Sequence, residues 1–82
     1  MRQTFIVSYD VSHPRRLRKV FKLMRGYGDH LQLSVFRCEL TARELFELRG
    51  KIGAIIEREE DQVLFVDVGP SEGRGRGSIS AM

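Results

Sequence analysis

The chain opens with an alternation of apolar and polar positions. In residues 3–10, QTFIVSYD, Phe5, Val7 and Tyr9 share one parity, and the other parity ends at Asp10. A period of two predicts a strand whose two faces differ. The segment is rich in aromatic and β-branched residues, which favour strands. Tyr9 and Asp10 therefore end the first strand on opposite faces.

The period then changes to that of a helix. Ser12 or His13 can cap it, Pro14 suits its first turn, and Gly26 is placed to end it. Its apolar positions recur at helical spacing and predict one buried stripe: Leu17, Val20, Phe21 and Met24. Its polar surface is expected to carry cations: Arg15, Arg18, Lys19, Lys22 and Arg25.

Residues 30–40 look extended, but their apolar phase flips between Val35 and Phe36. A phase flip indicates a bulge or sharp bend, so we expect two short strands, about 30–34 and 36–40, with almost no loop between them. Thr41 and Glu44 in TARE then form a capping box. A second amphipathic helix follows, with apolar positions at Leu45, Leu48, Ile52, Ile55 and Ile56.

Residues 62–68 predict a last strand that ends before Gly69 and Pro70. The remaining residues, 70–82, are rich in Gly, Ser and Arg. We interpret them as a tail in which residues 78–81 can form an edge strand, in this chain or on a partner protomer. Residues 1–69 then make a single domain, without an internal repeat.

The element order β-α-β-β-α-β predicts an α+β fold of the ferredoxin-like type, with two helices on one face of an antiparallel sheet. The first strand is partly apolar on both faces. The second sheet face therefore needs a partner, most simply a second copy of the chain in a homodimer. A domain of 82 residues buries only about 60–65% of its unfolded surface, so dimerisation would also add stability.

Charge is unevenly distributed along the chain. Residues 1–40 hold eight Lys or Arg against three Asp or Glu, and residues 41–82 hold six against eight. A local basic surface suggests an anionic partner, most often nucleic acid, but on charge alone a solvated helix face is the better interpretation. No apolar run is long enough to span a membrane, and no signal peptide is expected. The single Cys38 cannot form an internal disulfide, which indicates an intracellular, cytoplasmic protein.

Several familiar motifs are absent. The chain has no P-loop, no GxGxxG, no HExxH and no paired cysteines. GRGRG at residues 73–77 precedes no helix, so we assign it to the tail. Residues 63–68, VLFVDV, lack the glycines and exposed aromatic residues of an RNA-recognition motif. His13 and His30 lack metal-site spacing, so no zinc site is expected.

Four segments together resemble one protein family. YDVS, then RRLRKVFKLMRGYG, then LQLSVFRCELT, and finally QVLFVDV occur in this order over residues 3 to about 68. The combination is similar to the small CRISPR-associated spacer-acquisition nucleases, the second of the two core adaptation proteins. The resemblance implies a homodimer of ferredoxin-like domains that cleaves RNA or double-stranded DNA with a divalent metal. It also implies that the dimer bridges CRISPR integrase subunits during spacer acquisition in antiviral defence.

The resemblance also assigns roles to residues. Tyr9 and Asp10 match the family's catalytic strand end, with Asp10 as ligand to Mg²⁺ or Mn²⁺. Seven positions are implied in nucleic-acid binding: Arg15, Arg16, Arg18, Lys19, His30, Ser34 and Phe36. His30 departs from the family, because many members have a basic residue there and histidine is only partly charged near neutral pH.

One carboxylate holds Mg²⁺ poorly, since this ion needs octahedral oxygen coordination. A two-fold dimer would supply Asp10 twice at one point. Without the resemblance, Asp10 would be interpreted as an ordinary turn or cap residue after a strand.

Two functions remain open on this sequence: a metal-dependent nuclease using Asp10, and a non-catalytic adaptor that binds DNA and integrase. A small-ligand regulatory domain is disfavoured by the basic first helix and by the lack of an attached enzyme domain.

Overall fold

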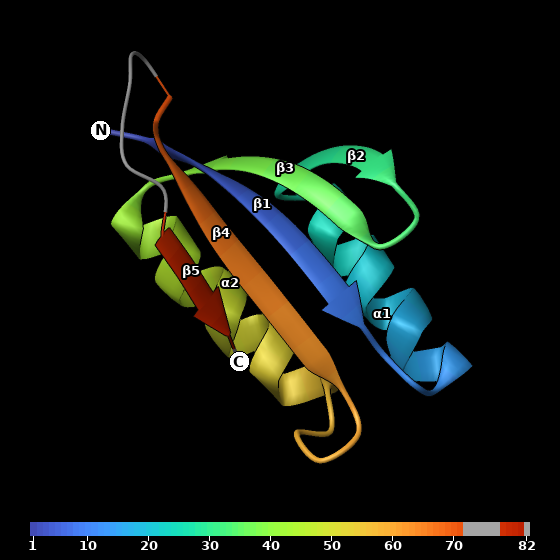
Figure 1. Ribbon diagram of the computed structural model, residues 1–82. Coiled ribbons are helices and arrows are strands. Elements are labelled where there is room, and N and C mark those ends of the chain that lie inside the picture. The colour runs from blue at the N-terminus through green and yellow to red at the C-terminus, as the bar shows by residue number, and fades with distance from the viewer. Residues whose placement is uncertain (72–77, 82) are drawn as a thin grey trace.

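The computed structural model describes residues 1–71 and, as backbone, residues 78–81. Its elements follow the predicted order, with the tail segment as a fifth strand: β1 (Gln3–Asp10), α1 (Pro14–Arg25), β2 (Gly28–Gln32), β3 (Val35–Leu40), α2 (Ala42–Ile55), β4 (Gln62–Pro70) and β5 (Ser78–Ala81). The strands form one antiparallel sheet in the order β2-β3-β1-β4-β5. Both helices cover the same face of this sheet, and the opposite face is open (Figure 1). The predicted α+β ferredoxin-like fold is confirmed.

The core lies between the sheet and the helices. β1 contributes Phe5, Val7 and Tyr9, as its alternation predicts. The helices contribute Val20 and Met24 from α1 and Leu48 and Ile52 from α2, all fully buried. The expected buried stripe of α1 is wrong at one position, because Leu17 is 37% exposed. Leu17 lies in the first turn and a half of α1, beyond the edge of the core.

Both helices begin as their sequences predict. At α1 the cap is His13, whose Nδ1 accepts a hydrogen bond from the Arg15 amide at 3.1 Å. At α2 the capping box forms: Glu44 donates its amide to Thr41 Oγ1 at 3.1 Å, and Glu44 Oε1 accepts from the Thr41 amide at 2.9 Å. These bonds satisfy amide groups that have no partner within the helix.

The strands of the β2–β3 hairpin lie slightly earlier than expected. β2 spans Gly28–Gln32 rather than 30–34, and a two-residue turn, Leu33 and Ser34, separates it from β3. β2 starts early because Gly28 approaches β3 closely. A Cβ atom on Gly28 would lie only 2.4 Å from the Arg37 carbonyl oxygen, so any residue with a side chain would clash at this position.

The end of β4 also differs from the expectation. The strand continues to Pro70, which pairs with Gln3 after a register shift. Gly69 has φ 103°, which places the irregularity at this residue. Proline has no amide hydrogen to donate to the ladder, and it is tolerated beside a bulge because the regular ladder bonds are interrupted there.

The expected edge strand of the tail forms as β5 and pairs with β4 of the same chain. Its exchange with a partner protomer stays a prediction. The expectation for GRGRG falls on residues outside the described part of the chain.

Candidate nucleic-acid interface

Tyr9 and Asp10 end β1 on opposite faces of the sheet. Tyr9 is 4% exposed and stacks on Phe36, with ring centroids 6.2 Å apart. Asp10 is exposed, pairs with Gln62 of β4, and follows the parity of the open face. The Asp10 carboxylate is therefore presented to solvent beside a surface that the helices leave uncovered.

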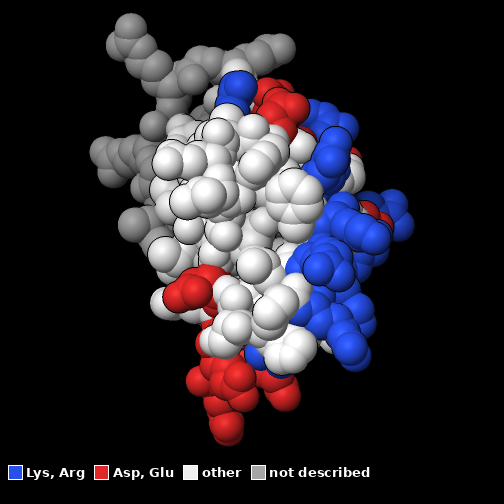
Figure 2. Space-filling model, turned by 90° about the vertical axis from the view of Figure 1, so that its right-hand side faces the viewer, with Lys and Arg blue, Asp and Glu red and all other residues white. Residues whose placement is uncertain are grey.

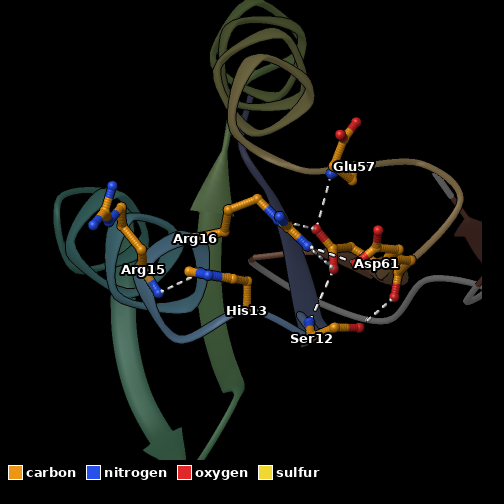
Figure 3. Close-up of polar contacts among 7 residues, drawn as sticks. Ser12, His13, Arg15, Arg16, Glu57 and Asp61 are labelled. Atoms are coloured by element: carbon orange, nitrogen blue, oxygen red, sulfur yellow. Dashed lines mark hydrogen bonds and ion pairs between the residues drawn. The ribbon is translucent and has the colours of Figure 1, made fainter.

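The backbone that follows Asp10 is fixed by a buried carboxylate, Asp61. Its side chain is fully buried and accepts four hydrogen bonds from three residues (Figure 3). The Ser12 amide donates to Oδ1 at 2.9 Å and the Glu57 amide to Oδ2 at 2.8 Å. Arg16 donates from Nε to Oδ2 at 2.8 Å and from Nη2 to Oδ1 at 3.2 Å. This arrangement, the Asp61 clamp, joins the β1–α1 loop to the loop before β4.

The clamp sets the ionisation of its members. Asp61 has a pKa of about 2, below its ordinary value of 3.8, chiefly because Arg16 donates a hydrogen bond to it. The same bond raises the pKa of Arg16. The Ser12 hydroxyl donates a hydrogen bond to the Glu60 carbonyl at 2.7 Å, which is a second bond between the same two loops. Near neutral pH Asp61 is therefore an anion that compensates the charge of Arg16.

Arg16 therefore differs from the other cations of α1, because its charge is paired within the fold. Its side chain is 21% exposed and is directed at Asp61 and Glu60, the latter at 3.3 Å. Arg15, Arg18 and Lys19 are exposed on the same helix. On the face shown in Figure 2, Lys and Arg side chains form a band along one side of the molecule, and Asp and Glu side chains gather mainly near the top and the bottom. An exposed cationic band of this kind suits a phosphate backbone.

Ser34 and Phe36 lie directly beside the strand end. The Tyr9 amide donates to the Ser34 carbonyl at 3.1 Å, which joins β1 to the β2–β3 turn. Phe36 is fully buried in the described chain, so it supports the site rather than presenting a surface. His30 donates from Nε2 to the Leu33 carbonyl at 2.7 Å and packs on Phe36, with ring centroids 4.9 Å apart. His30 thereby braces the turn.

The structure thus brings together four of the predicted residues and separates others. Tyr9, Ser34, Phe36 and His30 meet at the junction of β1 with the β2–β3 turn. Arg16 points elsewhere, into the Asp61 clamp. Asp61 itself was not anticipated, because it stands within a run of acids, EREED at 57–61, that resembles an ordinary solvated loop.

Cys38 is not a candidate nucleophile. It is fully buried, and burial raises the pKa of its thiol to about 11, with a smaller contribution from Asp29. The thiolate required for nucleophilic attack is therefore scarce near neutral pH. Cys38 is instead a small residue of the core.

A comparison with family models now places the chain. Residues 3–73 match the model described as CRISPR associated protein Cas2.

The chain belongs to the Cas2 family.

Named relatives agree with the family model. A CRISPR-associated endoribonuclease Cas2 from Geobacter sulfurreducens is 44% identical over 72 residues, which cover 88% of this chain and 76% of the relative. One from Rhodospirillum rubrum, named CRISPR-associated endoribonuclease Cas2 1, is 44% identical over 83% of this chain and 67% of its own length. The resemblance inferred from the sequence is therefore confirmed.

Solved structures of the same fold agree as well. The hypothetical protein TT1823 from Thermus thermophilus superposes with a TM-score of 0.82 at 30% identity, over 95% of this chain and 96% of that protein. Streptococcus pyogenes Cas2 superposes with a TM-score of 0.71 at 36% identity, over 76% and 81% of the two chains. The family match over residues 3–73 includes β1, where Tyr9 and Asp10 lie. Neither helix of the described residues has the length and apolar character of a membrane span.

Proposed function

We propose that the chain acts in CRISPR adaptation as a homodimer that binds nucleic acid and cleaves it as a divalent-metal-dependent endonuclease. The observation that carries this proposal is the exposed Asp10 at the end of β1, on the open sheet face of a Cas2-family chain. The endoribonuclease names of the relatives support cleavage of RNA. Double-stranded DNA remains the second candidate substrate.

Dimerisation is supported by the composition of the open sheet face. Ile6 pairs with Val66 on β4 and with Arg37 on β3, and Ser8 pairs with Val35 and Leu64, so these side chains are cross-strand neighbours. Three strands thus place apolar side chains next to one another on the face that carries Asp10. A second copy of the chain would cover them and bring two Asp10 side chains to one axis.

A divalent metal ion fits this arrangement only if the two protomers of a dimer share it. Among residues 1–71, no three His, Cys, Asp or Glu side chains cluster closely enough to hold an ion. Mg²⁺ commonly uses one or two carboxylates and completes its octahedron with water and phosphate oxygens. Two Asp10 carboxylates would meet that need for Mg²⁺ or Mn²⁺. When bound, the metal would supply an activated water and neutralise charge on the phosphate.

The chain's own residues would orient the substrate. Exposed cations of α1, namely Arg15, Arg18 and Lys19, would hold successive phosphates. Tyr9 would act in its protonated form, because burial raises the pKa of its phenol. The proposed contribution of Tyr9 is therefore to hold the strand end and to donate a hydrogen bond, since a protonated phenol cannot serve as a base.

The adaptor function is the alternative, in which the dimer binds DNA and bridges CRISPR integrase subunits without cleaving. A specific observation favours keeping it: each protomer offers a single exposed carboxylate at the strand end. Binding of phosphate by α1 requires no chemistry at Asp10.

The test compares wild type with Asp10→Asn, which keeps the shape of the side chain and removes its charge. Single-stranded RNA and duplex DNA are incubated with Mg²⁺, with Mn²⁺ and with chelator, across neutral and alkaline pH. Cleavage by wild type should require metal and rise with pH, because the metal activates water for deprotonation. Asp10→Asn should retain fold and binding and lose cleavage. Equal cleavage by both proteins would refute a role for Asp10.

Spacer acquisition in cells, with the cognate integrase present, separates the two functions. If neither protein cleaves and both bind DNA and support acquisition, the adaptor function is the correct account. If Asp10→Asn loses cleavage and acquisition together, the nuclease activity is required for adaptation.

A further inference from the structure

A groove lies between the first turns of α1 and the β2–β3 turn, and of the residues that line it only Tyr9 and Arg18 have a part in the proposed cleavage. Its volume is about 440 Å³, and its walls are mainly apolar. The residues that line it are Tyr9, Pro14, Leu17, Arg18, Phe21, Leu33 and Ser34. The groove therefore joins two segments that are distant in sequence but meet where the Tyr9 amide binds the Ser34 carbonyl.

The rim of the groove exposes two leucines. Leu33 is 80% exposed and Leu17 is 37% exposed. Leu33 also has φ 39°, in the left-handed region that side chains other than Gly, Asn and Asp rarely adopt. Backbone strain of this kind persists where the surroundings impose it, and it concentrates at binding sites. The turn is held in this conformation in part by His30, whose Nε2 donates to the Leu33 carbonyl.

The groove is apolar but its border is cationic. Arg18 lines it directly, and in the part of the chain that the structure describes Arg18 has no ion-pair partner. It differs in this respect from Arg16, whose charge the Asp61 clamp compensates. Lys22 and Arg15 are exposed one turn away on either side of Arg18. A ligand for this groove should therefore combine a flat or apolar body with a nearby anion.

We propose that the groove binds an unpaired nucleobase, with the phosphate of the same nucleotide at Arg18. This proposal rests on the proposed nucleic-acid binding and assigns it a second contact besides the backbone. A base has an apolar π face that stacks on aromatic and aliphatic side chains, and Phe21 and Leu33 provide such walls. A base inside a duplex is stacked on its neighbours and cannot enter. The groove therefore favours single-stranded segments and strand ends over the interior of a duplex.

The deciding experiment compares Leu33→Asn with Leu31→Asn. Asparagine tolerates a left-handed backbone, so Leu33→Asn removes the apolar wall without adding strain. Leu31 is a matched control, because it is 54% exposed in the same hairpin and does not line the groove. Thermal unfolding of both variants establishes that each is folded, and Leu33→Asn should be at least as stable as wild type.

Binding is measured in chelator, so that no metal-dependent cleavage intervenes. The probes are a single-stranded oligonucleotide containing the fluorescent base 2-aminopurine, the same strand with abasic sites, and a blunt duplex. Leu33→Asn should bind the single strand roughly tenfold more weakly than wild type, in line with the loss of one stacked base. It should bind the duplex and the abasic strand as wild type does. Leu31→Asn should match wild type on all three probes. The 2-aminopurine emission should change when the single strand binds to wild type or to Leu31→Asn, and should change little when it binds to Leu33→Asn.

Three outcomes would overturn the proposal. If Leu33→Asn binds the single strand as wild type does, with duplex binding intact, the base site is refuted and the proposed function stands. If Leu33→Asn changes the sedimenting mass instead, the groove is covered by a second copy of the chain. If wild type binds none of the probes, both proposals fail. Conversely, base-dependent binding by a wild type that never cleaves would support the groove and refute the nuclease.

Discussion

Arg16 and Arg18 lie two residues apart on α1, but their guanidinium groups have different surroundings. Arg16 makes a two-pronged contact with the buried Asp61, with its Nε 2.8 Å from Oδ2. Such bidentate pairs are strong and directional. Arg18 is exposed at the edge of the groove. The same residue type therefore stabilises the fold at one position and is available to an anion at the other.

This difference predicts opposite effects of two alanine substitutions. Arg16→Ala should lower the melting temperature, because it leaves the buried Asp61 carboxylate without its cation. It should change the salt dependence of nucleic-acid binding little. Arg18→Ala should leave the melting temperature unchanged and reduce the slope of log affinity against log salt by about one unit. Calorimetry and binding titrations over a salt series measure both. An unchanged melting temperature for Arg16→Ala would contradict the structural role of the clamp.

The pKa of Asp61 predicts how stability depends on acid. A carboxyl group whose pKa is lowered by folding stabilises the folded state fully above its ordinary value of 3.8, and this stabilisation is lost as pH falls to about 2. Wild type should therefore lose stability more steeply than Asp61→Asn between these two values, whereas the difference between them should be constant near neutral pH. Urea unfolding at a series of pH values measures this. Glu59→Gln, an exposed change in the same loop, should follow wild type.

At the scale of single residues, the sequence alone identifies some members of the site and not others. Tyr9 and Asp10 are found because they end an alternating strand and because the resemblance extends over them. Asp61 is not found, since its partner Arg16 is 45 positions away and a loop has no periodicity to interpret. Which acid of EREED turns inward depends on distant partners, the Arg16 side chain and the Ser12 amide.

Elements are predictable where their determinants are local. Thr41 and Glu44 lie three residues apart, and the capping box they predict is present at α2. Element boundaries depend on distant partners instead. β2 begins at Gly28 because its backbone fits closely against Arg37 and Cys38, and β4 continues to Pro70 because Gln3 pairs with it. Neither contact is visible in the hydrophobic pattern.

The capping box predicts a measurable stability change. Thr41→Ala should destabilise the domain by about 1 kcal/mol, because the Glu44 amide loses its acceptor. The pKa of Glu44 should stay below its ordinary value, because the largest cause of its depression is the hydrogen bond from the Thr41 backbone amide, which alanine keeps; only the smaller contribution of the Thr41 side chain is lost. Chemical denaturation gives the first quantity and NMR titration the second. Arg43→Ala, an exposed change in the same turn, is the control and should leave stability nearly unchanged. A Thr41→Ala variant as stable as wild type would show that the cap is dispensable.

At the scale of the molecule, the fold leaves one sheet face open and places Asp10 on it (Figure 1). The alternation in β1 predicts this, because Ile6 and Ser8 share the parity of Asp10. The sequence pattern cannot say how a partner would sit on that face, since docking depends on the shape of a whole surface. Sedimentation of wild type at micromolar concentration should give twice the chain mass of 9.5 kDa. Ile6→Lys should shift it toward the monomer, because it replaces an apolar side chain on the open face with a second cation beside Arg37 and next to Val66.

Subunit mixing tests whether the proposed metal site is shared across the dimer. If two Asp10 carboxylates hold one ion, a dimer of one wild-type and one Asp10→Asn subunit is inactive. Cleavage should then fall with the square of the wild-type fraction when the two proteins are unfolded together and refolded at fixed total concentration. If each protomer holds its own ion, cleavage should fall in simple proportion. Mixtures of wild type with Glu59→Gln should stay fully active, which controls for losses on refolding. A linear decline would refute the shared site while leaving Asp10 as a ligand within one protomer.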